Sequence, residues 1–180
     1  MIKTLKNLLR REPAKTEPAL RVLFVCTGNI CRSPTAEGVF KARLKAAGLA
    51  ELVDVASAGT HAHRGSPPDT RAQQFALLRG YDLSAIRSRQ LLAEDFARFD
   101  RLLVKDEDNL RALQNMQPSI TRAAGAADVE LLMKHAARHP SQREVPDPYY
   151  GSPQGFEHVL DLVEDACDGL LQTVKASLER

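Results

Sequence analysis

The sequence predicts a single-domain α/β fold in which helices cover both faces of a parallel sheet. Short apolar runs rich in β-branched residues alternate along the chain with longer segments of helical periodicity, which is the order that a parallel sheet requires. The 180 residues suffice for one domain with an ordinary hydrophobic core and are too few for two of typical size. Glycine and proline stand at the ends of several periodic segments, where they mark the limits of helices.

The first strand and the first helix are joined by a short loop. Residues 21–25 (RVLFV) are apolar and mostly β-branched or aromatic, as in a buried strand. After the loop, Ser33 stands at the position of an N-cap and Pro34 at the first position of a helix. The helix then extends over residues 34–47 and ends at Gly48.

A second strand is predicted at residues 52–56, and it leads into the stretch Ser-Ala-Gly-Thr. Residues 70–79 form the second helix, which ends at Gly80. We expect its inward side chains to be Phe75, Leu77 and Leu78.

The second half of the chain continues the alternation. Strands are predicted at residues 101–105 and 129–133, and helices at residues 107–115 and 153–178. The last helix carries one apolar stripe, formed by Phe156, Val159, Leu160, Val163, Cys167, Leu170, Leu171 and Val174. Four strands thus alternate with helices, and sheets of this kind bind ligands at the carboxyl ends of their strands.

The composition is that of a soluble globular protein. Apolar residues make up 43% of the chain and charged residues 27%, and no stretch approaches the roughly 18 uninterrupted apolar residues of a spanning helix. The formal net charge is only +2, with both signs mixed, which argues against nucleic acid as a partner. Three cysteines without a secreted framework spacing favour a reducing compartment, so we expect a cytoplasmic protein without a membrane span.

Residues 1–19 differ in character from the rest of the chain. We interpret them as a partly disordered N-terminal extension that precedes one domain over residues 20–180. The stretch begins with basic residues but lacks the apolar centre and the cleavage site of a secretion signal. The alternative is a short amphipathic helix that would bind an anionic surface through Leu5, Leu8 and Leu9.

The loop between the first strand and the first helix has the composition of a phosphate-binding loop. Five residues separate Cys26 from Arg32, and the helix that follows adds the positive end of its dipole at the same point. Backbone N–H groups of such a loop turn inward and bind a tetrahedral oxyanion. The guanidinium of Arg32 can hold two phosphate oxygens at once, which lysine cannot do. The loop residues are Thr27, Gly28, Asn29, Ile30, Cys31, Arg32 and Ser33.

Cys26 is the candidate nucleophile of this loop. The positive potential favours its ionised thiolate, which would attack a phosphoryl group held in line above it. Gly28 permits a tight turn, and Asn29 tolerates the left-handed backbone conformation that such loops require. Ser33 can donate its hydroxyl to the thiolate in addition to capping the helix. The plain alternative, a core cysteine at a strand end, leaves the neighbouring Arg32 and Ser-Pro unexplained.

A leaving oxygen needs a proton, and Asp147 is the candidate acid. It lies between two prolines that stiffen its backbone, in the stretch EVPDPYYG. The following Tyr149 and Tyr150 offer flat surfaces to an aromatic substrate. An ordinary proline-rich turn is the competing interpretation.

A metal site is a weaker alternative for the same region. The two cysteines of the loop lack a second pair of ligands, and His61 and His63 flank a single residue in a separate loop. We therefore expect no metal ion and no other cofactor.

These motifs resemble those of the low-molecular-weight protein tyrosine phosphatases, in particular their bacterial members. The matching stretches cover residues 20–178 in the order VCTGNICRSPTAEG, SAGT, DLS with RSRQL, DEDNL, and DPYYG followed by GFEHVLDLVEDACDGLL. The resemblance implies a four-stranded parallel sheet and metal-independent hydrolysis of phosphotyrosine through a phosphocysteine intermediate. It also implies phosphotyrosine-containing proteins as partners, with an autophosphorylated bacterial tyrosine kinase as one candidate, and we expect a monomer.

The resemblance assigns roles to individual residues. It implies that Cys26 is the nucleophile, that Arg32 holds the phosphate, and that Asp147 acts first as general acid and then as base. Cys31 matches a family cysteine that forms a reversible disulfide with the nucleophile under oxidation. The family residues that support the loop by hydrogen bonds match Asn29, Ser33 and Ser57.

The sequence departs from the family pattern at three places. Ile86 stands where many members have a histidine that binds the loop asparagine, which predicts a less firmly held Asn29. The stretch HAHRG lacks the usual pocket aromatic, and His61 or His63 is the candidate to stack in its place. Lys105 replaces an apolar residue at the end of the third strand, and the sequence suggests no reason for it.

Two other functions were compatible with the loop. A thioredoxin-coupled arsenate reductase would need two further cysteines near the middle of the chain, and residues 76–90 contain none. Cys167, on the apolar stripe of the last helix, is expected in the core instead. A binding module that holds phosphotyrosine without cleaving it would not need Cys26 and Asp147 together.

Overall fold

Strands and helices alternate along the computed structural model of the chain, which describes residues 17–116 and 127–179. Most of the predicted N-terminal extension, residues 1–16, lies outside the described residues. In chain order the elements are β1 (Leu20–Cys26), α1 (Arg32–Ala46), β2 (Val53–Gly59), α2 (Thr70–Leu78), α3 (Asp95–Arg98), β3 (Arg101–Val104), α4 (Glu107–Met116), β4 (Asp128–Leu131), a 3₁₀ helix (Leu132–His135) and α5 (Gln154–Leu178).

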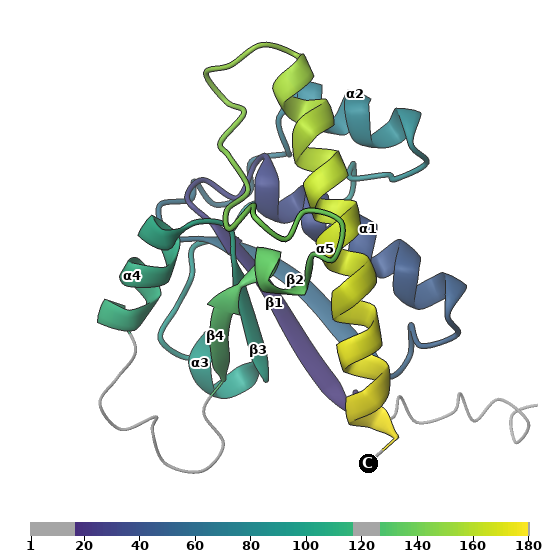
Figure 1. Cartoon of the computed structure of the whole chain (residues 1–180). Helices are drawn as coiled ribbons and strands as arrows, with labels where there is room; N and C mark the ends of the chain where they lie inside the picture. Colours follow the sequence, from purple (N-terminus) through teal and green to yellow (C-terminus); the bar gives the residue numbers. More distant parts are fainter. Residues whose placement is uncertain (1–16, 117–126, 180) are drawn as a thin grey trace, which may run out of the picture.

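The strands form one parallel sheet in the order β2-β1-β3-β4. Helices α1, α2 and α5 pack on one face, whereas α3 and α4 pack on the other (Figure 1). The predicted α/β fold, with a four-stranded parallel sheet covered on both faces, is confirmed. Because all strands run the same way, their carboxyl ends and the loops that follow them meet at one edge of the sheet.

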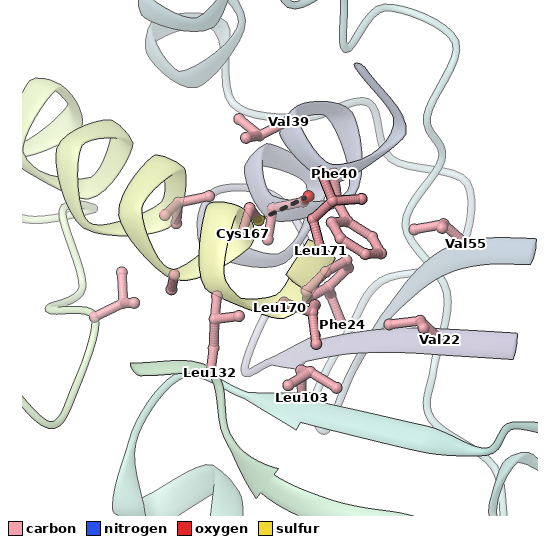
Figure 2. Close-up of a cluster of buried hydrophobic side chains, with 14 of the residues drawn as sticks. Val22, Phe24, Val39, Phe40, Val55, Leu103, Leu132, Cys167, Leu170 and Leu171 are labelled. Carbon is pink, nitrogen blue, oxygen red and sulfur yellow. Dashed lines mark hydrogen bonds between the residues drawn. The ribbon is translucent and has the colours of Figure 1, made fainter. Parts of the chain in front are cut away.

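The larger core lies between the sheet and α1 with α5 (Figure 2). Phe24 of β1 and Phe40 of α1 are fully buried and pack edge to face with ring centroids 5.7 Å apart. The predicted apolar stripe of α5 is buried along its whole length, which confirms that part of the interpretation. Burial of each such large side chain contributes about 1.5–3 kcal/mol, so this face holds α1 rigidly behind the loop that precedes it.

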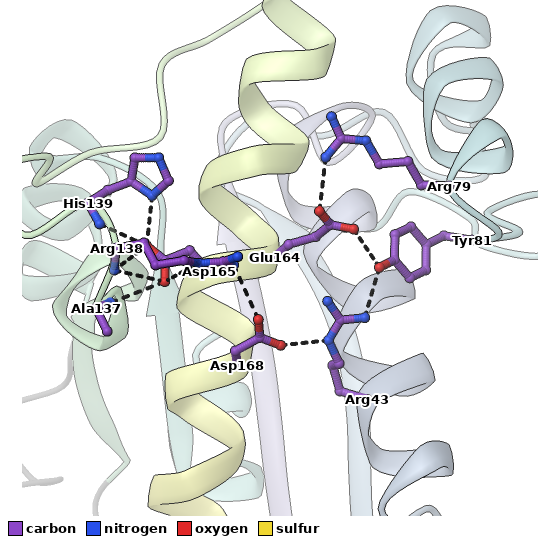
Figure 3. A network of polar contacts seen from close by, with 9 residues as sticks. All are labelled: Arg43, Arg79, Tyr81, Ala137, Arg138, His139, Glu164, Asp165 and Asp168. Carbon is purple, nitrogen blue, oxygen red and sulfur yellow. Dashed lines mark hydrogen bonds and ion pairs between the residues drawn. The ribbon is translucent and has the colours of Figure 1, made fainter.

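Polar contacts fix α5 on both of its sides (Figure 3). Toward α1, Asp168 accepts from Arg43 over 2.7 Å, and toward the segment after α2, Glu164 accepts from the hydroxyl of Tyr81 over 2.6 Å. On the other side, the buried carboxylate of Asp165 accepts from the segment that leaves the 3₁₀ helix, through Ala137, Arg138 and His139. Burial alone would raise the pKa of Asp165, but these hydrogen bonds, with that of His139 the strongest, lower it to about 2.

The start of α1 differs from the prediction. The helix begins at Arg32 with Cys31 as its N-cap, and no side chain caps it. The prediction of Ser33 as the N-cap is therefore wrong. The hydroxyl of Ser33 does not cap the helix because it contacts the sulfur of Cys26 instead, 3.0 Å away.

Helix α2 also differs from the prediction. Leu77 and Leu78 were expected inside, but their exposed fractions are 64% and 79%. The buried residues are Ala72 and Ala76, because α2 approaches its neighbours closely through its small side chains. The short helix α3 was not predicted, and Met133 lies in the 3₁₀ helix and not in β4. Among the described residues, no helix is long and apolar enough to cross a membrane.

Candidate active site

A cavity of about 320 Å³ lies at the carboxyl end of β1. Cys26 is the last residue of β1 and Arg32 the first of α1, so the loop between them forms the floor of this cavity. The segment that precedes α5 forms the wall, although it lies more than 100 residues away in the sequence. The lining residues are Cys26, Thr27, Gly28, Ile30, Cys31, Arg32, Asp147, Tyr149 and Tyr150.

The loop is shaped by two backbone features. Asn29 has a φ of 54°, in the left-handed region that asparagine tolerates, as its place in the loop indicated. Gly59, at the end of β2, lies directly behind the loop, and a Cβ there would come within 2.5 Å of the carbonyl oxygen of Thr27. Within the described part of the chain, the N–H groups of Gly28, Ile30 and Cys31 donate to no protein acceptor. They therefore remain available to an anion in the cavity.

The sulfur of Cys26 is surrounded by hydrogen-bond donors. The backbone N–H of Asn29 donates to it over 3.3 Å, and the hydroxyl of Ser33 lies 3.0 Å away. The cysteine is buried at the N-terminus of α1, where the helix dipole is positive. Each of these groups stabilises a thiolate more than a thiol.

Asn29 links the nucleophile to the sheet through its side-chain amide. Its Nδ2 donates to the hydroxyls of Ser33 and Ser57, each over 2.9 Å. The hydroxyl of Ser57 donates in turn to the carboxylate of Glu37 over 2.6 Å. Because Ser33 accepts from Asn29, its own proton is free to point at the sulfur of Cys26. The buried Glu37 thereby sets the direction of the whole chain of hydrogen bonds.

Asn29 keeps its partners in the absence of a histidine at Ile86. Its Oδ1 accepts from the backbone N–H of Arg89 over 2.9 Å, so both ends of the amide are bound. Ile86 packs half-buried against the larger core instead. The weaker hold on Asn29 that Ile86 suggested is therefore not seen.

Arg32 is buried and held by groups from two distant segments. Its Nη1 donates to Asp106 over 2.5 Å and to the carbonyl oxygen of Val145 over 3.1 Å, and its Nη2 donates to Asp147 over 3.1 Å. Burial alone would lower the pKa of Arg32, but Cys26, Asp106 and Asp147 raise it. Arg32 is thus a permanent cation, aimed by Asp106 across the cavity.

Asp147 and the two tyrosines lie at the mouth of the cavity. The side chain of Asp147 is half exposed, and its Oδ1 accepts from the backbone N–H of Tyr149 over 3.1 Å. The rings of Tyr149 and Tyr150 pack edge to face with centroids 4.8 Å apart. Arg71 lies 5.5 Å from the ring of Tyr149 and holds it from outside. The mouth therefore combines a carboxyl group with flat apolar surfaces.

Comparison with known proteins identifies the family. The family model described as low molecular weight phosphotyrosine protein phosphatase matches residues 21–180. The chain belongs to this family. A low molecular weight protein-tyrosine-phosphatase of Streptomyces coelicolor is 44% identical over 161 residues, which are 88% of this chain and 96% of that protein. One from Synechocystis is 42% identical over 160 residues, or 88% of this chain and 99% of that protein.

Solved structures agree with the sequence comparison. The crystal structure of a protein tyrosine phosphatase from Entamoeba histolytica has a TM-score of 0.81 and 36% identity, covering 88% of this chain and 98% of that one. The resemblance drawn from the sequence motifs is therefore confirmed, and the chain is a protein tyrosine phosphatase, a hydrolase.

The phosphatase site unites only some of the predicted residues. Cys26, Arg32 and Asp147 line one cavity, whereas His61 and His63 are not among its lining residues. The ring of His61 lies beside the hydroxyl of Thr60, 3.1 Å away, so it does not take the place of a pocket aromatic.

Sequence reasoning missed Glu37, Asp106 and Asn109 in this phosphatase. Glu37 lies one helical turn after Ser33, and that spacing could have indicated a shared face. Asp106 lies two residues after the end of β3, at the edge where the other site residues lie. Asn109 donates to the hydroxyl of Thr27 over 3.2 Å, and its place in the family stretch DEDNL could have indicated a role at the site.

The remaining cysteines of the phosphatase differ in accessibility. Cys31 lines the cavity, and burial together with Asp69 and Cys26 raises its pKa to about 12. Cys167 is fully buried under α1, and burial raises its pKa to about 12 as well. Both therefore stay protonated at neutral pH.

Proposed function

We propose that this phosphatase hydrolyses phosphotyrosine on proteins through a phosphocysteine intermediate on Cys26. The observation that carries the proposal is the convergence of Cys26, Arg32 and Asp147 on one cavity. A nucleophile, a phosphate-binding cation and a carboxyl group meet there, and phosphate transfer needs all three.

In the first step, the thiolate of Cys26 attacks phosphorus and forms the P–S bond. The bond from phosphorus to the tyrosine oxygen breaks, and that oxygen takes a proton from Asp147. Arg32 and the loop N–H groups hold the equatorial oxygens in line. The hydroxyl of Ser33 stabilises the sulfur before attack.

In the second step, Asp147 acts as the base. Its carboxylate takes a proton from water, the water oxygen attacks phosphorus, and the P–S bond breaks. Phosphate leaves, and Cys26 is again a thiolate. Without substrate, Asp147 is paired with Arg32 over 3.1 Å. A phosphate dianion competes for the same guanidinium, so binding of substrate frees Asp147 for its proton transfers.

The proposed substrates are phosphotyrosine-containing proteins, with an autophosphorylated bacterial tyrosine kinase as one candidate. The rings of Tyr149 and Tyr150 at the mouth of the cavity support an aromatic phosphoester over a shorter alkyl one.

The test measures how fast the purified chain releases phosphate in a buffer that contains reductant and chelator. The substrates are a phosphotyrosine peptide, a phosphoserine peptide of the same sequence, and an autophosphorylated tyrosine kinase. Acid quenching during turnover, followed by mass spectrometry, should find phosphate on the peptide that contains Cys26. Release from the phosphoserine peptide at an equal rate would contradict the substrate class. Turnover without any phosphate on Cys26 would contradict the mechanism.

Replacement of Asp147 by asparagine is expected to affect substrates according to their leaving groups. A poor leaving group such as phenol needs the proton, so its kcat/KM should fall about 100-fold or more, whereas p-nitrophenyl phosphate should lose about 10-fold. Asp108→Asn, at an exposed position of α4, is the matched control and should leave both rates unchanged. Equal losses for both substrates would remove Asp147 as the acid.

We further assign Cys31 the role of redox partner of Cys26, because both cysteines line one cavity. All three cysteines are free thiols, which suits a protein that works in the reducing cytoplasm. Peroxide would oxidise Cys26 to a sulfenic acid. The thiol of Cys31 would then displace water and form a disulfide, which added thiol reduces. Peroxide should therefore inactivate the wild type reversibly, whereas the Cys31→Ser variant should become progressively unrecoverable. Identical recovery of both, measured after dithiothreitol treatment, would disprove the pairing.

A further inference from the structure

Lys105 is a fully buried lysine directly after β3 that pairs with no carboxylate among the described residues. Its exposed fraction is 0%, although lysine is almost never fully buried unless paired. The Nζ atom donates to the carbonyl oxygen of Leu103 over 3.3 Å and lies 4.5 Å from the centroid of the Phe24 ring. Among the described residues no acidic side chain forms an ion pair with it. Packing does not explain it, because methionine would fill a similar volume without the cost of burying a charge.

The register of the sheet brings Lys105 behind the nucleophile. Val104 pairs with Val25, and Lys105 and Cys26 are the next residues of the two parallel chains. Side chains alternate between the faces of a sheet, so both project toward the face that carries Phe24 and Leu103. Figure 2 shows Phe24 and Leu103 together with Cys167 in that core. Lys105 therefore enters the core directly under the phosphate-binding loop.

Four ionisable groups act on Lys105 from the elements around it. Cys26 at the end of β1, Cys167 on α5 and Asp106 after β3 favour its protonated form, whereas Arg32 on α1 opposes it. Burial is the largest influence and lowers the pKa of Lys105 to about 7. Burial therefore makes the ammonium of Lys105 a much stronger acid than that of an exposed lysine, so nearby charges influence whether it keeps its proton.

When Cys26 is ionised, as the proposed mechanism requires, its thiolate is the negative charge acting on Lys105 that no ion pair offsets among the described residues. Cys167 is protonated at neutral pH because burial raises its pKa to about 12. Asp106 is paired with Arg32, and Arg32 is shared with Asp147. An interaction between two groups is reciprocal: if the Cys26 thiolate favours the ammonium of Lys105, the ammonium favours the thiolate equally.

We propose that Lys105 is a positioning residue for catalysis, whose buried ammonium stabilises the thiolate of Cys26 from the core side of the loop. The inference rests on the proposed nucleophilic role of Cys26. It gives the loop a second cation, behind the sulfur, while Arg32 faces the substrate in front of it.

The test compares Lys105→Met with wild type in a thiolate titration followed by ultraviolet absorbance. The Cys26→Ser variant supplies the baseline, so that the difference between the two titrations reports Cys26 alone, and burial raises the pKa of both Cys31 and Cys167 to about 12. The midpoint of thiolate formation should rise by about one pH unit in Lys105→Met, with a roughly tenfold slower alkylation by iodoacetamide below that midpoint. Lys134→Met, at an exposed position, is the matched control and should change neither value. Equal midpoints in wild type and Lys105→Met would overturn the proposal.

A second measurement does not depend on the folding of any Lys105 variant. The ¹³Cε resonance of Lys105 should titrate near pH 7 in the wild type and at lower pH in Cys26→Ser, because the thiolate that favours the ammonium is gone. An unchanged titration in Cys26→Ser would also overturn the proposal. Neither measurement uses turnover, so a chain that shows the shifts but hydrolyses no phosphotyrosine would contradict the proposed function and leave the Lys105 inference standing.

Discussion

Replacement of Cys26 by serine is expected to lower phosphate release by a factor on the order of 10⁴ or more. Serine keeps the size of the side chain, and its hydroxyl can take over the contacts to Ser33 and to the N–H of Asn29. It does not ionise at working pH, so the attacking group is lost while the loop stays intact.

The Cys26→Ser variant should still bind phosphate esters. Arg32 and the free N–H groups of the loop are unchanged, so the Kd for a phosphotyrosine peptide should stay within about tenfold of the wild-type KM. Calorimetry measures that affinity, and release of phosphate from p-nitrophenyl phosphate measures the activity. Residual turnover above about a hundredth of the wild-type rate would contradict a mechanism that needs the thiolate.

Replacement of Arg32 by lysine is expected to lower kcat/KM by about 10³-fold, even though the positive charge is retained. A lysine cannot hold two equatorial oxygens of the transition state at once, so the loss should appear in kcat as well as in KM. Inhibition by inorganic phosphate should weaken in parallel, because it uses the same oxygens.

Stability should also fall in Arg32→Lys. The guanidinium joins Asp106, Asp147 and the carbonyl oxygen of Val145, and an ammonium cannot satisfy all three. Chemical denaturation should show a loss of about 1–3 kcal/mol. Arg101→Lys is the matched control, since Arg101 pairs with Glu130 on the sheet and is not among the residues that line the cavity. A similar loss of activity in both variants would mean that the effect is general and not due to phosphate binding.

Local features of the chain predicted the fold and the centre of the site. The alternation of strands and helices depends on the periodicity of neighbouring residues, and the apolar stripe of α5 was readable for that reason. The Cys26 to Arg32 loop was readable because its chemistry lies within seven consecutive residues. In these seven residues the end of a strand, a loop and the N-terminus of a helix surround one ligand, so the site can be recognised without knowledge of contacts between distant residues.

Contacts between distant residues were decided by the tertiary structure alone. Arg32 is held by Asp106 and Asp147, which are 74 and 115 residues away in the sequence. The motif around Asp147 indicated a general acid, but it did not indicate that this carboxylate pairs with Arg32. The sequence predicts two roles for Ser33, a donor to the thiolate and a helix cap, and the structure shows the first without the second. A capping pattern describes what a residue can do locally, whereas packing decides which of its possible partners lies within reach.

The sequence by itself determined the order of the elements, the phosphate-binding loop and the family. Only the tertiary structure decided that Leu78 faces solvent while Lys105 is buried, which reverses what their side chains alone suggest. Hydrophobicity describes the average preference of a residue. Where a side chain lies depends on the surface that its element meets, and α2 meets its neighbours through alanines whereas the end of β3 runs beneath the loop of Cys26.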